Sequence, residues 1–157
     1  MNDTTMQDTH RNTKLDAAAA IRQLTGFIGA HQLEFMGLNC YGEERQWFID
    51  KLVELGQLVT TMPKVFEQNG KGDEAVVHLH YFTGGCDWHI TERDITPEQL
   101  QAYGLANLGH GAELGYISIE EIKSIGVIEL DLHFTPKKLT EALKKIGMPM
   151  GEESTTE

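Results

Sequence analysis

The sequence predicts an α+β domain in which N-terminal helices pack on an antiparallel sheet of about four to five strands, with a C-terminal closing helix. Apolar residues recur at helical spacing up to Val59, alternate from Val76 onward, and return to helical spacing after Pro136. Helices, then strands, then a helix is an order typical of the α+β class. A chain of 157 residues is long enough for one such domain with its own core.

The first part of the chain, residues 14–62, is predicted to be helical. Thr13 followed by Asp16 is typical of a capped helix start, and the alanine-rich segment after it predicts a helix as far as Gly26. A second short helix is expected over residues 27–35. The third and clearest helix has apolar residues at i, i+4, i+7 and i+11: Phe48, Leu52, Leu55 and Val59.

A tight β-hairpin is predicted where the apolar spacing changes to alternation. The runs 76–82 and 87–92 are rich in strand-forming residues, and Gly84-Gly85 between them predicts a two-residue turn with positive φ. This turn fixes the register and pairs His80 with His89 on the polar face. The opposite face, expected to be core, carries Val77, Leu79, Tyr81, Trp88 and Ile90.

Further strands and a closing helix are expected after the hairpin. Strands are predicted over residues 103–108, 113–119 and 128–134, with a short helix at 120–122. Thr135-Pro136 is typical of a helix start, and this helix should turn Leu139, Leu143 and Ile146 toward the sheet. The predicted organisation is a single domain over 14–150, sheet-rich over 75–147, with flexible tails at 1–13 and 151–157.

Composition narrows the classes of function. Lys and Arg number 13 and Asp and Glu number 24, so the formal net charge is −11, which disfavours direct binding to nucleic acid. No apolar run approaches the roughly 20 residues that cross a bilayer, so no membrane association is expected. The N-terminal segment is polar, and Cys40 and Cys86 are too few for a disulfide framework. We therefore expect a cytoplasmic protein with free thiols.

The hairpin histidines are the candidate metal site. His78, His80 and His89 are assigned to its polar face, and Asp131 and His133 on a later strand could add ligands. Imidazoles on neighbouring strands can share a zinc ion. However, the sequence has neither a helical HxxxH motif nor a CxxC pair, the spacings typical of zinc sites. We therefore expect no cofactor, with zinc at these histidines as the alternative.

Candidate nucleophiles and acid–base groups are less well supported. Cys86 lies three residues before His89, at a turn where the two side chains are not expected to face each other. The carboxylates of Glu92, Asp94 and Glu113 can do acid–base work only where burial separates their pKa values. Nothing in the sequence indicates such burial, so solvated charges are expected. A metal-dependent or hydrolytic enzyme using the histidines or these carboxylates is an alternative function.

Several short blocks follow one another in an order that points to a family. They are Trp88-His89-Ile90-Thr91-Glu92 and the runs 103–109, 113–118 and 129–134. On these blocks, the stretch from Val77 to Leu139 resembles an uncharacterised family of small domains carried by phages, conjugative plasmids and long polyvalent proteins. The resemblance implies a genomic setting and a fold. It implies no reaction, because none is established for the family.

Some residues of these blocks are not explained by packing, and they define a predicted binding surface: Glu92, Asp94, Glu113, Tyr116, Glu120 and Asp131. Strand alternation sends either Glu113 or Tyr116 outward, beside Gly115, which permits close approach. We predict a non-catalytic accessory protein of a mobile genetic element that binds a host or element protein through an acidic surface, for example in counter-defence. A further alternative is an acidic decoy that mimics DNA. The sequence leaves the oligomeric state open.

Overall fold

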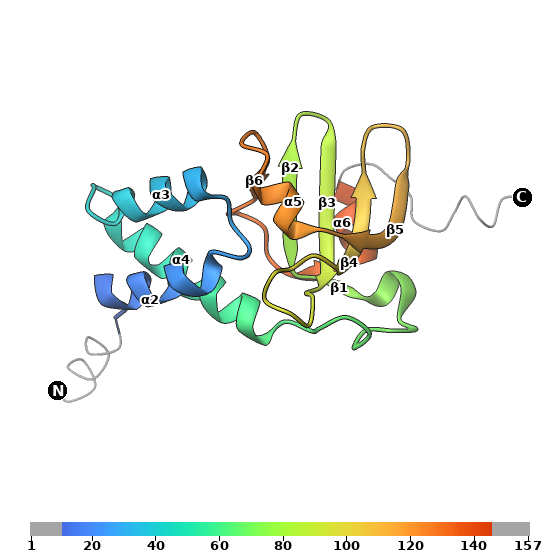
Figure 1. Cartoon of the computed structure of the whole chain (residues 1–157), viewed down its shortest axis with the longest axis horizontal. Coiled ribbons are helices and arrows are strands. Elements are labelled where there is room, and N and C mark those ends of the chain that lie inside the picture. The colour runs from blue at the N-terminus through green and yellow to red at the C-terminus, as the bar shows by residue number, and fades with distance from the viewer. Residues whose placement is uncertain (1–10, 146–157) are drawn as a thin grey trace, which may run out of the picture.

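The architecture places a helical bundle beside a β-sheet, which confirms the predicted α+β class (Figure 1). The computed structural model describes residues 11–145. Most of the two predicted tails, and Ile146, lie outside the described residues. Helices α2, α3 and α4 span Lys14–Leu24, Ala30–Asn39 and Arg45–Thr61 and confirm the three expected helices. None of the helices within residues 11–145 is long and apolar enough to cross a bilayer.

Local sequence explains where α2 starts and how it packs. The Thr13 hydroxyl accepts a hydrogen bond from the backbone N–H of Asp16 at 3.2 Å, and the Asp16 carboxylate accepts the N–H of Thr13 at 2.8 Å. This capping box satisfies two N–H groups that lack helical partners. α2 packs closely on α4, where a Cβ added at Gly56 would lie 3.0 Å from Cβ of Ala20. Small residues therefore set the approach of the two helices.

The main sheet has five antiparallel strands in the order β5-β4-β3-β2-β6. Their bounds are β2 Leu79–Thr83, β3 Cys86–Glu92, β4 Ala102–Asn107, β5 Ala112–Ile117 and β6 Glu129–Leu130. The β2–β3 hairpin has the predicted register, with His80 opposite His89. In its turn Gly84 alone takes a positive φ, of 50°, although Gly85 was also expected to do so. One such residue suffices because a two-residue turn can be built with positive φ at its first position only.

Two predictions about the C-terminal part are wrong. The strand expected over 128–134 is reduced to β6, because the Asp131 carboxylate accepts the backbone N–H of His133 at 2.9 Å and turns the chain. The last helix begins at Leu139 rather than directly after Pro136. Residues Lys137–Lys138 instead form strand β7, which pairs with β1, Val76–Val77. Helix α6, Leu139–Lys145, buries Leu139 and Leu143 as predicted.

Apolar side chains form two cores on opposite faces of the sheet. The larger joins α2–α4 and α5, Ile119–Lys123, to a sheet face that carries Leu79, Tyr81 and Ile90. The smaller lies beneath α6, behind the sheet in Figure 1, and includes Val77, Leu105, Leu139, Ala142 and Leu143. Val77 was expected in the larger core. It belongs to the smaller one because β1 is separated from β2 at residue 78 and pairs with β7.

Two polar side chains tie the helical bundle to the sheet. The buried hydroxyl of Tyr81 donates to the carbonyl oxygen of Phe27 at 2.6 Å. The Gln32 amide makes two 2.8 Å hydrogen bonds, one to the backbone N–H of Leu130 and one to its carbonyl oxygen. Gln32 therefore occupies the outer edge of β6, where a strand from another chain would otherwise pair.

Removing the Tyr81 hydroxyl is expected to destabilise the protein. Tyr81→Phe leaves the buried carbonyl of Phe27 without its hydrogen bond, which costs about 1–2 kcal/mol of unfolding free energy. Urea denaturation measures this loss. Tyr41→Phe is the matched control, because Tyr41 is exposed and its change should stay within about 0.5 kcal/mol. Equal stabilities of the two variants would contradict the tying role of Tyr81.

Candidate functional site

A pocket of 450 Å³, named the Glu92 pocket after its charged residue, opens between the loop of residues 65–75, strands β3 to β5 and the start of α6. Pockets of about 300 to 1,000 Å³ are typical of sites for small ligands. The lining residues that matter chemically are Phe66, Gln68, Glu92, Tyr103, Leu114 and Tyr116. Two of them, Glu92 and Tyr116, belong to the predicted binding surface.

The floor of the Glu92 pocket is held in place by the buried amide of Gln68. Its Nε2 donates to the carbonyl oxygens of Val76 and Thr91, at 3.0 and 2.8 Å, and its Oε1 accepts the N–H of Val76 at 2.8 Å. These bonds fix the 65–75 loop to β1 and β3. Because the amide is used within the fold, Gln68 positions the pocket and is not available to a ligand.

Glu92 is the charged residue of the pocket and is only 5% exposed. Its Oε1 accepts the backbone N–H of Phe66 at 3.0 Å, which leaves Oε2 for a ligand. A buried carboxylate is costly unless hydrogen bonds and a cation compensate it. The adjacent Arg93 is not that cation, since its guanidinium donates to the carbonyl oxygens of Met62 and Thr60. Within the described residues, Glu92 takes part in no salt bridge.

Phe66 adopts an unusual backbone conformation at the edge of this pocket. Its φ of 83° lies in the left-handed region, which costs a bulky residue on the order of 1–3 kcal/mol. Its ring is nevertheless 62% exposed. The fold therefore holds an aromatic ring in solvent next to a buried carboxylate. The sequence analysis did not identify Phe66 as a candidate site residue. The feature that could have indicated it is a lone aromatic residue in a polar loop that contains glycines.

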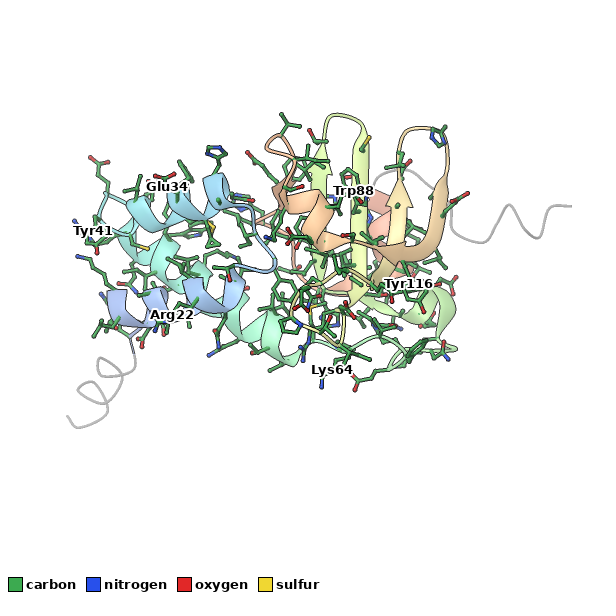
Figure 2. The ribbon with its side chains drawn as sticks, in the orientation of Figure 1. Arg22, Glu34, Tyr41, Lys64, Trp88 and Tyr116 are labelled. Carbon is green, nitrogen blue, oxygen red and sulfur yellow. The ribbon has the colours of Figure 1, made fainter. Side chains whose placement is uncertain are left out.

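Two tyrosines form the sheet side of the Glu92 pocket. Tyr103 and Tyr116 are paired across β4 and β5, and their rings meet edge to face with centroids 5.6 Å apart. Tyr116 is 56% exposed and lies at the β5 side of the sheet, away from Tyr41 on the helical bundle (Figure 2). Aromatic faces attract cations. The aromatic walls of the pocket and the Glu92 carboxylate therefore both attract a cation.

The remaining residues of the predicted binding surface lie elsewhere. Glu113 alternates with Tyr116 along β5 and projects from the opposite face of the sheet. Glu120 pairs with Lys123 within α5 at 3.0 Å. Asp131 lines a separate groove. The structure thus brings two of the six residues, Glu92 and Tyr116, into one pocket.

Asp94 organises the turn after β3. Its carboxylate accepts four hydrogen bonds, from the backbone N–H groups of Ile95, Leu100 and Gln101 and from the Thr96 hydroxyl, at 2.7 to 3.1 Å. Desolvation acts to raise the pKa of Asp94, but the hydrogen bonds from Gln101, Thr96 and Ile95 outweigh it and lower the pKa. This local structure accounts for Asp94 without a ligand.

His80 lies between two carboxylates on the polar face of the hairpin. Its Nε2 is 2.6 Å from Oδ1 of Asp87, and its Nδ1 is 3.0 Å from Oδ2 of Asp131. The ring stacks on His89, with centroids 4.6 Å apart, and contacts Phe134. With ionised carboxylates, both contacts are hydrogen bonds only when both ring nitrogens carry a proton. The cluster joins β2, β3 and the turn after β6.

The other two hairpin histidines do not complete a ligand set with His80. Burial, with a smaller contribution from His80, lowers the pKa of His89 to about 4, and burial also lowers the pKa of His78. Nδ1 of each is buried and has no hydrogen-bond partner among the residues that the structure describes. Among residues 11–145, no group of three or more His, Cys, Asp or Glu side chains is placed to hold a metal ion. His78 and His89 are therefore neutral packed rings at pH 7.

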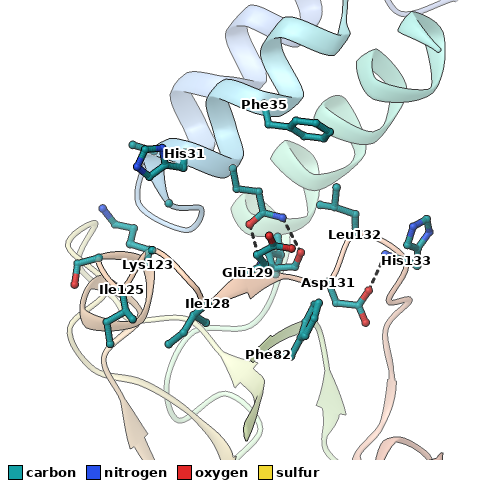
Figure 3. Close-up of a pocket in the computed structure, with 16 residues that line it drawn as sticks. His31, Phe35, Phe82, Lys123, Ile125, Ile128, Glu129, Asp131, Leu132 and His133 are labelled. Atoms are coloured by element: carbon teal, nitrogen blue, oxygen red, sulfur yellow. Dashed lines mark hydrogen bonds between the residues drawn. The ribbon is translucent and has the colours of Figure 1, made fainter. Parts of the chain in front are cut away.

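A second opening of 700 Å³, the α3–β6 groove, lies between the helical bundle and the edge of the sheet (Figure 3). Phe35 from α3, Phe82 from β2 and Ile125 after α5 give it an apolar surface. Of its charged lining residues, Lys123 pairs with Glu120 and Asp131 with His80, whereas Glu129 is exposed and forms no salt bridge within residues 11–145. The groove therefore combines an apolar surface with one exposed carboxylate.

The fold and its openings define a small α+β protein with a carboxylate-bearing aromatic pocket and a separate apolar groove. The chain belongs to a family of proteins of unknown function, DUF2958, whose model matches residues 52–147. The match runs from within α4 to α6 and includes the sheet and the Glu92 pocket. It also contains the stretch on which the predicted resemblance to an uncharacterised family rests. No curated protein and no solved structure matches the chain.

Proposed function

We propose that this protein is a non-catalytic accessory protein of a mobile genetic element, and that it binds a host or element protein through the surface around the Glu92 pocket. The observation that carries the proposal is the set of exposed apolar side chains at the pocket. Phe66, Leu114 and Tyr116 are 62%, 44% and 56% exposed. Apolar side chains that gather around a pocket in this way are typical of interaction sites.

The charge of the chain supports a basic partner. A formal net charge of −11 speeds encounter with a positively charged protein and opposes encounter with nucleic acid. The mobile-element setting, with counter-defence as one such role, follows from the resemblance to domains carried by phages and plasmids. An acidic decoy that mimics DNA is the alternative that uses the same charge.

Affinity capture with two matched variants tests the proposal. Wild-type protein, Tyr116→Ala and Phe35→Ala are immobilised, and the proteins that each retains from a lysate of the encoding organism are quantified by mass spectrometry. Tyr116 and Phe35 are both 56% exposed, but Phe35 lies in the α3–β6 groove. Tyr116→Ala should lower recovery of the partner at least about tenfold, as expected for a central aromatic contact, and Phe35→Ala should retain it.

The opposite pattern, loss with Phe35→Ala and retention with Tyr116→Ala, would contradict the proposal and assign binding to the α3–β6 groove. Recovery that is abolished by moderate salt but unchanged by either variant would favour the decoy. Melting temperatures of the variants are compared first, because Phe35 also contacts Phe48 edge to face.

A hydrolytic enzyme is the second candidate, and the position of His80 between two carboxylates favours it. Such pairs orient a histidine for acid–base work. Here, however, both nitrogens of His80 are engaged by Asp87 and Asp131, and the ring packs against His89 and Phe134. These contacts indicate that His80 holds β2, β3 and the turn after β6 together, because a general base would need a ring nitrogen free to reach a substrate.

A further inference from the structure

We infer that the Glu92 pocket receives a lysine side chain presented by the protein partner. This inference rests on the proposed function and names the group that is recognised. Three features of the pocket carry it: a buried carboxylate that forms no salt bridge within the described part of the chain, aromatic walls, and an apolar path to the carboxylate.

The negative charge of the buried Glu92 carboxylate favours binding of a cation. Glu92 is 5% exposed, it accepts one hydrogen bond, from Phe66, and no salt bridge within residues 11–145 includes it. Its neighbour Arg93 is held at the end of α4. An incoming cation compensates the buried charge, whereas an anion is repelled and a neutral group leaves Oε2 without a strong partner.

The walls of the pocket add to this preference. Tyr103 and Tyr116 meet edge to face, so their rings present surfaces in two nearly perpendicular planes. Phe66 adds a third ring, held by the hydrogen bond between its backbone N–H and Glu92. Cations bind over aromatic faces, most strongly where water is partly excluded. The strain at Phe66 is consistent with a ring placed for contact with a ligand, because such strain gathers at ligand sites.

Lysine fits the available atoms better than arginine. A guanidinium is recognised best by two parallel hydrogen bonds to both oxygens of a carboxylate. Oε1 of Glu92 is already used by Phe66, so one oxygen remains, and this suits the compact ammonium group. Leu114 lines the same pocket and is 44% exposed, so it provides apolar surface for the four-carbon stem of lysine.

NMR titration of the full-length protein with single-residue probes tests the inference. The probes are the N-acetyl methylamides of lysine, arginine and norleucine, the last of which keeps an apolar stem without the charge. The lysine probe should shift the backbone amide signals of Phe66 and Tyr116 with an affinity in the millimolar range, as expected for so small a ligand. Equal binding of norleucine, or tighter binding of arginine, would overturn the assignment to lysine.

Charge-matched variants give the decisive comparison. Glu92→Gln keeps an oxygen that can accept the N–H of Phe66 but removes the charge, so the loop should stay in place while lysine binding weakens at least about tenfold. Glu113→Gln removes the same charge from an exposed position outside the pocket and should bind as the wild type does. Glu92→Gln with unchanged lysine affinity would refute the role of the carboxylate.

A separate variant tests the contribution of the aromatic rings to lysine binding. Tyr116→Leu keeps an apolar wall and removes a π face, and we expect lysine binding about three- to tenfold weaker while norleucine binding is unchanged.

Partner capture distinguishes failure of the lysine inference from failure of the proposed binding surface. If Tyr116→Ala abolishes capture but Glu92→Gln retains it fully, the binding surface stands and the lysine inference fails. If neither variant affects capture, the proposed surface itself is wrong.

Discussion

Replacing Gly104 by alanine is expected to lower the free energy of unfolding by at least about 3 kcal/mol. Gly104 lies in β4 opposite Ile90 of β3. A Cβ at this position would overlap the carbonyl oxygen of His89 and lie 2.9 Å from Cα of Ile90. Both are backbone atoms of the central strand, so no change of rotamer relieves the clash and the two strands must separate.

Gly115 offers a matched control for this substitution. It pairs with Gly104 across β4 and β5, yet a Cβ there meets no atom within 4 Å. Gly115→Ala should leave stability unchanged or raise it by up to about 1 kcal/mol, because alanine loses less backbone entropy on folding. Urea denaturation of both variants checks the contrast. Equal midpoints would indicate that β3 and β4 can shift to admit a methyl group at Gly104.

The hairpin register was predictable because it depends on neighbouring residues. The glycine turn and the alternation around it specify the pairing of His80 with His89 without help from the rest of the chain.

The alternation of apolar residues over 128–134 wrongly predicted a long strand, for a physical reason. Leu130 packs in the larger core and Phe134 against the smaller one, so the chain passes from one core to the other and Asp131 turns it between them.

The Glu92 pocket was predictable only in part. Glu92 and Tyr116 stood out as polar or aromatic residues that packing did not explain. Phe66 reaches them through a hydrogen bond that joins residues 26 positions apart, and hydrophobic periodicity carries no information about such a bond. The same limit applies to the predicted close approach at Gly115. A Cβ at Gly115 meets no atom within 4 Å, whereas the backbone of β3 closely approaches its partner Gly104.

Stability is expected to fall by roughly 2 kcal/mol between pH 7 and pH 5 because of His89. The side chain is buried, and burial lowers its pKa from the ordinary 6.5 to about 4. The folded protein therefore resists a proton that the unfolded chain takes up below about pH 6.5. The stability associated with this group is present above that pH and is lost as the pH falls toward 4.

The charges around His89 act in both directions but leave burial dominant. His80 and Lys137 lower its pKa further, while Asp87 and Asp131 raise it. His89→Phe removes the titrating group and keeps an aromatic ring against His80, so its loss of stability between pH 7 and pH 5 should be smaller than that of the wild type by roughly 2 kcal/mol. Unfolding free energies from urea denaturation at the two pH values give this difference.

His110→Asn provides the control for the change in histidine content. His110 is exposed in the loop between β4 and β5, so the variant keeps His89 and its buried surroundings and should follow the wild-type pH dependence. The same pH dependence in wild type and His89→Phe would contradict the prediction. His89 would then take up its proton without penalty in the folded protein, which requires water at the ring that the structure packs between His80 and Phe134.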